Sequence, residues 1–294
     1  MKDILYYPGC SLKDYAKGLE ESALVVSEDL GIELNQMERW NCCGTVFSLA
    51  QDNLMKQLAP IRNLVRAREQ GYDEVYTLCG MCYNTLKRAD RFVEEDTDRL
   101  EKINAFMDRE QDYDGSVEVK HYLGLLRDEV GWDQVSEPVK TPLDGLQIAP
   151  YYGCMLLRPK EIGLDDHHSP TILDDLISSL GGQVVEYPYS SECCGSYNTV
   201  NNEDMVHQKI KSIVSSANSN GADLIITGCP LCHFNLDTRQ AEILKTDPTV
   251  HELPVLYFTQ LMALAYGYID SCRFQEHELD PRPVLAAEKI AVER

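Results

Sequence analysis

The stretch 40–44 reads Trp-Asn-Cys-Cys-Gly, and the stretch 191–195 reads Ser-Glu-Cys-Cys-Gly. Each adjacent cysteine pair is preceded by a lone cysteine, Cys10 or Cys154, and followed by a Cys-x-x-Cys motif that begins at Cys79 or Cys229. The two patterns read C-x31-CC-x35-CxxC and C-x38-CC-x34-CxxC. Ten of the 11 cysteines thus fall into two copies of one pattern, which indicates an internal repeat.

The residues around these cysteines predict strands that alternate with helices. We expect strands at 3–7, 32–34, 74–78, 146–151, 183–187 and 223–227, and helices at 15–30, 53–69, 171–180 and 203–220. This alternation predicts an α/β fold of two pseudo-symmetric repeats, each with a small, mostly parallel sheet flanked by helices. The cysteine motifs follow predicted strands, so we expect them at the carboxyl edge where open α/β sheets bind ligands.

The segment 131–145 contains two prolines and two glycines and is the expected boundary between the repeats. We therefore predict one domain over 1–145 and a second over 146–294. The first should include a helical insertion, with helices at 92–109 and 117–130. The last residues, 272–294, are too few to form a core of their own, so we expect them to dock partner subunits together with the charged helices of 92–130, or else to lie as a surface tail.

Composition excludes several classes of protein. The 294-residue chain has 48 acidic and 27 basic residues, a net charge of −21, which disfavours nucleic acid and anionic membranes as partners. Its apolar stretches are far shorter than the roughly 20 residues of a membrane span, and no signal peptide is evident. We therefore expect a cytoplasmic protein. In that reducing compartment its cysteines are better suited to metal binding or redox chemistry than to disulfides.

Several kinds of site could use such cysteines. Structural zinc needs four ligands, one fewer than each copy of the pattern offers. A thioredoxin-like redox pair would use only the Cys-x-x-Cys motif, and unligated core cysteines would not explain the repeated spacing. Iron–sulfur clusters commonly take four thiolates, so a fifth implies an unusual cluster. The glycine after each cysteine pair would let the backbone pass close to an inorganic core.

The two complete Cys-Cys-Gly patterns resemble the B subunit of the heterodisulfide reductase of methanogenic archaea. Three further segments share this resemblance: 153–159 (Gly-Cys-Met-Leu-Leu-Arg-Pro), 228–233 (Gly-Cys-Pro-Leu-Cys-His) and 255–260 (Val-Leu-Tyr-Phe-Thr-Gln). The pattern also occurs in iron–sulfur subunits of glycolate, lactate and glycerol-3-phosphate oxidation and in thiol:fumarate reductases. An electron-relay subunit of such an enzyme is therefore the alternative function.

The resemblance implies two noncubane 4Fe-4S clusters, each held by five cysteines. The first cysteine set would be Cys10, Cys42, Cys43, Cys79 and Cys82, and the second cysteine set Cys154, Cys193, Cys194, Cys229 and Cys232. It also implies a substrate, the mixed disulfide of coenzyme M and coenzyme B. The implied partners are the C subunit of heterodisulfide reductase as electron donor, its flavin-containing A subunit, and a hydrogenase or formate dehydrogenase in an electron-bifurcating complex.

The substrate's anionic groups would need cations in an otherwise acidic chain. Lys13 lies three residues after Cys10, Arg158 lies four after Cys154, and His233 follows Cys232 directly. We take these three as candidate substrate-binding residues; the alternative for each is a surface salt bridge or a solvated side chain, and for His233 alone this alternative is favoured. Arg62, Arg66 and Arg68 have helical spacing and are expected on a surface, while Cys272, outside both patterns, is expected as a free buried cysteine.

The repeat also suggests a mechanism. Reduction of a disulfide needs two electrons, whereas an iron–sulfur cluster supplies one at a time. Our hypothesis is that two clusters flank one S–S bond, so that each supplies one electron and no free radical leaves the site.

Overall fold

The computed structural model describes residues 2–45 and 53–290. Its first half is an α/β unit around a four-stranded parallel sheet with the strand order β2-β1-β3-β4. The strands are β1 (Lys2–Tyr6), β2 (Ile32–Gln36), β3 (Glu74–Thr77) and β4 (Glu118–His121). The helices are α1 (Gly9–Leu12), α2 (Lys17–Asp29), α4 (Leu54–Glu69), α5 (Gly80–Glu94), α6 (Thr97–Phe106), α7 (Tyr122–Leu125) and α8 (Trp132–Ser136).

The second half repeats this plan around a second parallel sheet, with the matching order β6-β5-β7-β8. Its strands are β5 (Gln147–Tyr151), β6 (Gln183–Val184), β7 (Leu224–Thr227) and β8 (Val255–Tyr257). Its helices are α9 (Ile172–Ser179), α10 (Glu203–Ser219), α11 (Pro230–Phe234), α12 (Gln240–Leu244), α13 (Phe258–Tyr266) and α14 (Arg282–Ala287). The predicted fold of two pseudo-symmetric α/β repeats is therefore confirmed.

The central strands form because their sequences are apolar enough to be buried on both faces. All four residues of β7, Leu-Ile-Ile-Thr, are buried, as expected for a parallel strand covered by helices. The preceding helix ends at a turn where Gly221 takes a positive φ of 87°, and Gly71 takes the equivalent place before β3 with a φ of 83°. Each turn sends the chain directly into the strand that leads to a Cys-x-x-Cys motif.

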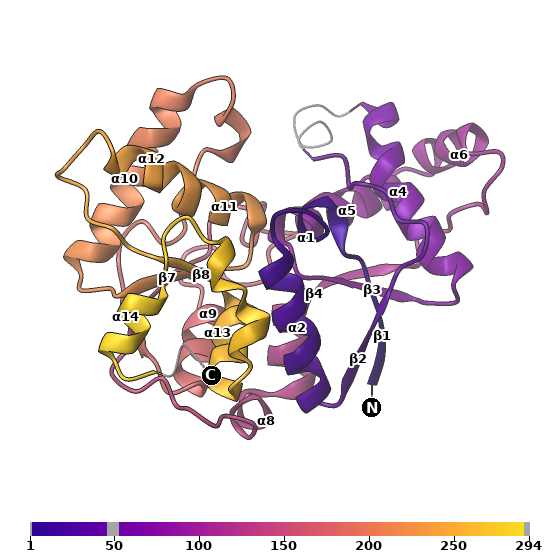
Figure 1. Ribbon diagram of the computed structural model, residues 1–294. Coiled ribbons are helices and arrows are strands. Elements are labelled where there is room, and N and C mark those ends of the chain that lie inside the picture. Colours follow the sequence, from indigo (N-terminus) through magenta and orange to yellow (C-terminus); the bar gives the residue numbers. More distant parts are fainter. Residues whose placement is uncertain (1, 46–52, 291–294) are drawn as a thin grey trace.

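The two repeats pack reciprocally. The helix that follows β8, α13, packs against α2 of the first repeat, and α8, which follows β4, packs against α9 of the second. The pair α2 and α13 lies in the middle of the molecule between the two sheets (Figure 1). The Ser22 and Thr259 hydroxyls join it through a buried 2.6 Å hydrogen bond, and Tyr266 Oη donates to the carbonyl oxygen of Val135 at 2.6 Å. This packing holds the carboxyl edges of the two sheets next to each other.

Three details differ from the expectations. The predicted helix at 117–130 is wrong in its first part, because Glu118–His121 forms β4. In this segment Val117, Val119 and His121 are buried alternately with more exposed residues, a period of two that is typical of a strand. The strand β8, within the segment 255–260, is not among the predicted strands. The charged region 92–109 is helical but is divided, since α5 ends at Glu94 and α6 begins at Thr97.

The carboxyl-terminal segment packs on the chain itself as far as residue 290. Leu285 of α14 and Ile290 are both buried, and Asp237 accepts hydrogen bonds from the backbone amides of Glu278 and Leu279. None of the helices in the described part of the chain combines the length and the apolar character that crossing a membrane would need.

Candidate metal centres

The first cysteine set gathers at the carboxyl ends of three neighbouring strands. Cys10 lies in α1 after β1, and the pair Cys42 and Cys43 lies in the loop after β2. Cys79 is the N-cap of α5, and Cys82 lies in the first turn of that helix. A parallel sheet brings these strand ends to one edge, so residues far apart in sequence meet in one place.

Contacts between sulfur atoms link this set. The Sγ atoms of Cys10 and Cys42 are 3.7 Å apart, and those of Cys43 and Cys82 are 3.6 Å apart. The thiols of Cys42 and Cys43, and those of Cys79 and Cys82, also lie close enough to affect each other's pKa, so the five thiols lie near one another. None of these cysteines is in a disulfide.

The second cysteine set has the same arrangement on the other sheet. Cys154 follows β5, Cys193 and Cys194 follow β6, and Cys229 is the N-cap of α11. The Sγ atoms of Cys194 and Cys232 are 3.6 Å apart. The neighbouring Cys154 thiol is the largest influence that lowers the pKa of the Cys193 thiol to about 6. The Gly195 amide and the Lys209 charge also lower this pKa, whereas burial and the Glu192 charge raise it.

The two sets meet at the first cysteine of each Cys-x-x-Cys motif. The thiols of Cys79 and Cys229 lie close enough to affect each other, and Cys79 lowers the pKa of the Cys229 thiol after the larger effect of Cys232. Beside them, the backbone amide of Gly80 donates to the carbonyl oxygen of Gly228 at 2.9 Å. A Cβ on Gly80 would lie 2.9 Å from Cγ of Leu156, so this junction leaves no room for a larger residue. The two centres therefore adjoin directly.

Glycines give the sulfur atoms room in both repeats. Gly9, with a φ of +69°, would place a Cβ 3.0 Å from Cys82 Sγ and 3.4 Å from the Tyr7 ring. Gly153, with a φ of +61°, would place one 3.3 Å from Cys232 Sγ and 3.4 Å from the Tyr151 ring. The same contacts recur in both halves, which indicates that each site is shaped for a group that needs the backbone close by.

All-thiol ligation fits an iron–sulfur group, because thiolates are the usual ligands of such clusters. Buried polar atoms without a hydrogen-bond partner support the same conclusion. Nε2 of His121, the hydroxyl of Tyr257 and Oγ1 of Thr227 are such atoms within the described residues. A Cβ added to Gly228, which precedes Cys229, would lie 3.7 Å from the His121 ring. Burial raises the pKa of Tyr257, and the charges of Tyr15, Cys229 and Cys79 raise it further. Donors near cluster sulfurs commonly tune such centres.

Sequence reasoning missed a pair of rings behind each Cys-x-x-Cys motif. Tyr83 packs edge-on against His121 in the first repeat, with ring centroids 5.8 Å apart, and His233 stacks on Tyr257 in the second at 4.2 Å. His121 and Tyr257 end the equivalent strands β4 and β8, so histidine and tyrosine exchange places between the repeats. Burial lowers the pKa of both His121 and His233 to about 4. Each pair forms an uncharged backing for its cysteine set.

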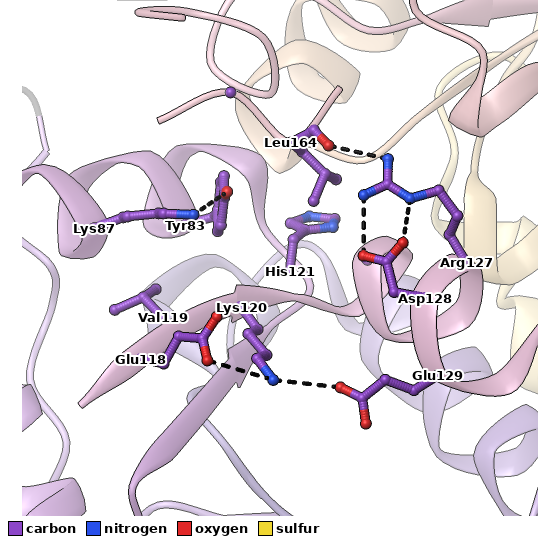
Figure 2. Close-up of a pocket in the computed structure, with 12 residues that line it drawn as sticks. Tyr83, Lys87, Glu118, Val119, Lys120, His121, Arg127, Asp128, Glu129 and Leu164 are labelled. Carbon is purple, nitrogen blue, oxygen red and sulfur yellow. Dashed lines mark hydrogen bonds and ion pairs between the residues drawn. The ribbon is translucent and has the colours of Figure 1, made fainter. Parts of the chain in front are cut away.

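A cavity of about 420 Å³ opens beside the first of these pairs (Figure 2). His121 lies between Tyr83 and the ion pair of Arg127 with Asp128, while Lys120 pairs with Glu118 and Glu129 (Figure 2). Three cations, Lys87, Lys120 and Arg127, and three carboxylates, Glu118, Asp128 and Glu129, line this cavity, so it carries no excess of positive charge to attract an anionic substrate.

Tyr197 crosses from the second repeat toward the first. Its hydroxyl contacts the Sδ atom of Met155 at 3.3 Å and that of Met81 at 3.5 Å. Met81 lies inside the Cys-x-x-Cys motif of the first set, and Met155 follows Cys154 of the second. Tyr197 thus touches residues that adjoin both sets, a role that a lone tyrosine in the sequence does not indicate.

The three candidate substrate-binding residues lie in separate surroundings. Lys13 forms an ion pair with the buried carboxylate of Glu20, which also accepts a hydrogen bond from Tyr6. The Arg158 side chain is exposed, and His233 is buried with Nε2 3.0 Å from the carbonyl oxygen of Val255. No hydrogen bond or ion pair joins any of these three described side chains to another. Their role in binding substrate remains a prediction.

The remaining sequence candidates have structural contacts. Arg62 pairs with Glu110, Arg68 pairs with Asp73, and Arg66 donates to Oδ1 of Asn41. The thiol of Cys272 is buried and 3.4 Å from the carbonyl oxygen of Gln260, so its prediction as a free buried cysteine is confirmed.

Comparison with known proteins supports this description of the site. The cysteine-rich domain family named CCG matches residues 4–87 and 148–237, which contain both cysteine sets. The chain is 32% identical over 268 residues to the 8-methylmenaquinol:fumarate reductase membrane anchor subunit of Wolinella succinogenes, covering 90% of this chain and 93% of that protein.

Two archaeal relatives are similar over the same extent. The chain is 28% identical over 278 residues to the B subunit of the ferredoxin/F(420)H(2)-dependent CoB-CoM heterodisulfide reductase of Methanosarcina acetivorans, covering 91% of this chain and 90% of that protein. It is 29% identical to a protein of Archaeoglobus profundus that is named as similar to the B subunit of heterodisulfide reductase, with 88% and 89% covered. The resemblance predicted from the cysteine patterns is therefore confirmed.

A solved structure of a hypothetical protein from Helicobacter pylori has a similar fold, with a TM-score of 0.76 and 13% identity. The match covers 95% of this chain and 53% of that one, so this chain spans about half of the solved protein. At this identity the likeness shows the fold alone.

Proposed function

Since the chain belongs to the CCG cysteine-rich domain family, we propose that it is the disulfide-reducing iron–sulfur subunit of a heterodisulfide reductase. The substrate would be the mixed disulfide of coenzyme M and coenzyme B. The observation that supports this most is the contact of two complete five-cysteine sets at Cys79 and Cys229. Relatives named after the B subunit of heterodisulfide reductase match nearly the whole chain.

The residues that would hold the two centres are the two cysteine sets. When bound, each iron–sulfur group supplies one electron at a time. Five thiols per set, against the common four, support the noncubane type that the resemblance implies. The chain contributes close glycines at Gly9 and Gly153 and, at the Cys79–Cys229 junction, buried surroundings that exclude water.

A pair of adjoining one-electron centres suits the chemistry of a disulfide. The reaction takes up two electrons and two protons, breaks one S–S bond and releases two thiols. Two sets related by pseudo-twofold symmetry would present equivalent surfaces to the two sulfur atoms of one bond. The thioether-lined surface around Tyr197, which touches residues of both repeats, is where we expect the bond to lie.

The proposed activity can be measured with a reduced viologen dye as the electron source. We expect the purified chain with its clusters to oxidise the dye when the coenzyme M–coenzyme B disulfide is added, with two dye molecules consumed per disulfide. The matched control is Cys272→Ala, which lies outside both sets and should retain the full rate. A protein with full iron content that oxidises no dye on addition of the disulfide would refute the proposal.

The alternative is an electron-relay subunit in a complex of the fumarate reductase type. It is favoured by the 32% identity to the Wolinella succinogenes protein, which exceeds the 28–29% found for the two archaeal proteins described above. In that case the chain would pass electrons between partners and reduce no disulfide itself. The dye assay separates the two functions, since only the first predicts turnover of the disulfide by the isolated chain.

The electron donor would be another polypeptide, as in the heterodisulfide reductase complexes to which the relatives belong by name. We propose that the C subunit of a heterodisulfide reductase donates the electrons and receives them from the flavin-containing A subunit. A hydrogenase or a formate dehydrogenase would belong to the same complex. The docking surface proposed from the sequence comprises 92–130 and the tail 272–294. Because Leu285 and Ile290 are buried within this chain, only the outer face of the described part of the tail, 272–290, is free for a partner.

A further inference from the structure

Lys209 is a cation without an ion-pair partner among the described residues, beside the second cysteine set. It lies on α10 and lines a cavity of about 360 Å³ together with Cys193. Its Cδ is 3.2 Å from the position that a Cβ on Gly195 would take, directly after Cys194. Glu192 lines the same cavity, but no ion pair joins it to Lys209 among the described residues.

The first repeat has no lysine at the equivalent place. A Cβ on Gly44, which follows Cys43, would meet Cβ of Ala59 at 3.4 Å and Cδ of Pro60 at 3.9 Å. Both Ala59 and Lys209 lie on the helix that follows the Cys-Cys-Gly loop and face its glycine. The two centres are therefore alike in their ligands and different in their charge surroundings.

Two cations near the first set are engaged by other groups. Lys13 is paired with the buried Glu20 carboxylate. Arg66 donates to Oδ1 of Asn41, next to Cys42, and is surrounded by charges of both signs, those of Glu110 and Glu69 and those of Arg62 and Arg39. Lys209 differs from both because its stem packs directly on the glycine of the Cys-Cys-Gly loop, where the first repeat has Ala59.

A cluster held by five thiolates is negatively charged, and each added electron makes it more so. A nearby cation favours the reduced state, and net charge is one of the factors that set the potential of such a cluster. We propose that Lys209 raises the reduction potential of the second centre above that of the first, so that an electron entering the pair settles at the second centre. This role of Lys209 rests on the proposed iron–sulfur function, and Lys209 would act on the second centre through its charge without being a ligand.

The test replaces the charge and keeps the packing. Lys209→Met retains the aliphatic stem against Gly195, and we expect it to lower the midpoint potential of one centre and leave the other unchanged. A tenfold change in the distribution of electrons between the centres corresponds to about 59 mV for a one-electron couple. The measurement is a redox titration followed by electron paramagnetic resonance. Lys209→Arg should restore the original potential, which a purely structural role would not require.

Two further variants make the test specific. Ala59→Lys should raise the potential of the first centre and reduce the difference between the two. Lys211→Met, two residues along α10, removes a lysine that pairs with Asp247 at 2.8 Å and should change neither potential. If Lys209→Met contains both clusters and neither midpoint potential changes, the proposed role of Lys209 is wrong. Absence of iron from the unmodified chain would instead overturn the proposed function.

Discussion

Replacing Cys43 with alanine will remove the first centre and abolish disulfide reduction. Cys43 is buried and lies 3.6 Å, sulfur to sulfur, from Cys82, so its replacement removes a thiol from the interior of the first set. Two four-iron clusters correspond to about eight iron atoms per chain, and the variant should retain about four. The measurements are iron and acid-labile sulfide after anaerobic purification, together with dye-linked turnover of the mixed disulfide.

The symmetry of the molecule supplies the matched variants. Cys194→Ala removes the equivalent contact, 3.6 Å from Cys232, and should also leave about four iron atoms and no turnover. Cys272→Ala removes an equally buried thiol outside both sets and should leave about eight. Turnover near the unmodified rate in either single-centre variant would contradict the requirement for both centres.

Replacing Gly9 with alanine will have the next largest effect, because it disturbs a ligand without removing one. Gly9 has a φ of +69°, where an alanine costs about 1–2 kcal/mol. Its new Cβ would also lie 3.0 Å from Cys82 Sγ, a contact that can be relieved only by moving the sulfur. We expect lower stability and loss of the iron of the first centre, measured by thermal unfolding and by iron content.

Gly31→Ala separates these two causes. Gly31 has nearly the same φ, +68°, but no atom lies within 4 Å of its Cβ position. It should lose a similar free energy of unfolding, about 1–2 kcal/mol, and keep all of its iron. Gly153→Ala should mimic Gly9→Ala at the second centre, more mildly, since its contact with Cys232 Sγ is 3.3 Å. Full iron content in Gly9→Ala would show that the close approach is unimportant.

The repeat and the position of the cysteines could be predicted because their signals are local. Among the described residues, the interval between Cys42 and Cys79 and that between Cys193 and Cys229 each contain one long α-helix and one strand, and both elements have clear periodicity. The meeting of the cysteine motifs then follows from the rule that parallel α/β sheets collect loops at their carboxyl edge. No long-range information was needed for these features.

The ring pairs and the fourth strands depend on contacts between distant segments. Four residues, Glu118–His121, form β4 only because β3 offers a neighbouring edge, so the charged sequence around them reads as a helix. The exchange of Tyr83 and His121 for His233 and Tyr257 becomes visible only when the two sheets are superimposed as repeats.

Charge pairing explains why the candidate cations were harder to judge. Lys13 occupies the predicted place after Cys10, but its ion-pair partner Glu20 is seven residues further on. Glu20 lies in the first turn of α2, and the turn before this helix brings the two side chains together. Lys209 has no motif near it in sequence, and its distinction is a stem packed against Gly195 beside the second set, with no ion pair among the described residues. Such an absence can be recognised only after the neighbours are placed.

The central claim is that two adjoining centres act together on one disulfide, and a single-turnover experiment tests it most directly. The dithionite-reduced protein, freed of excess reductant, is mixed with one equivalent of the mixed disulfide, and both centres are followed spectroscopically while free thiols are counted. The account predicts that each centre loses one electron and that two thiols appear per protein chain. Oxidation of only one centre, or of neither, would contradict it.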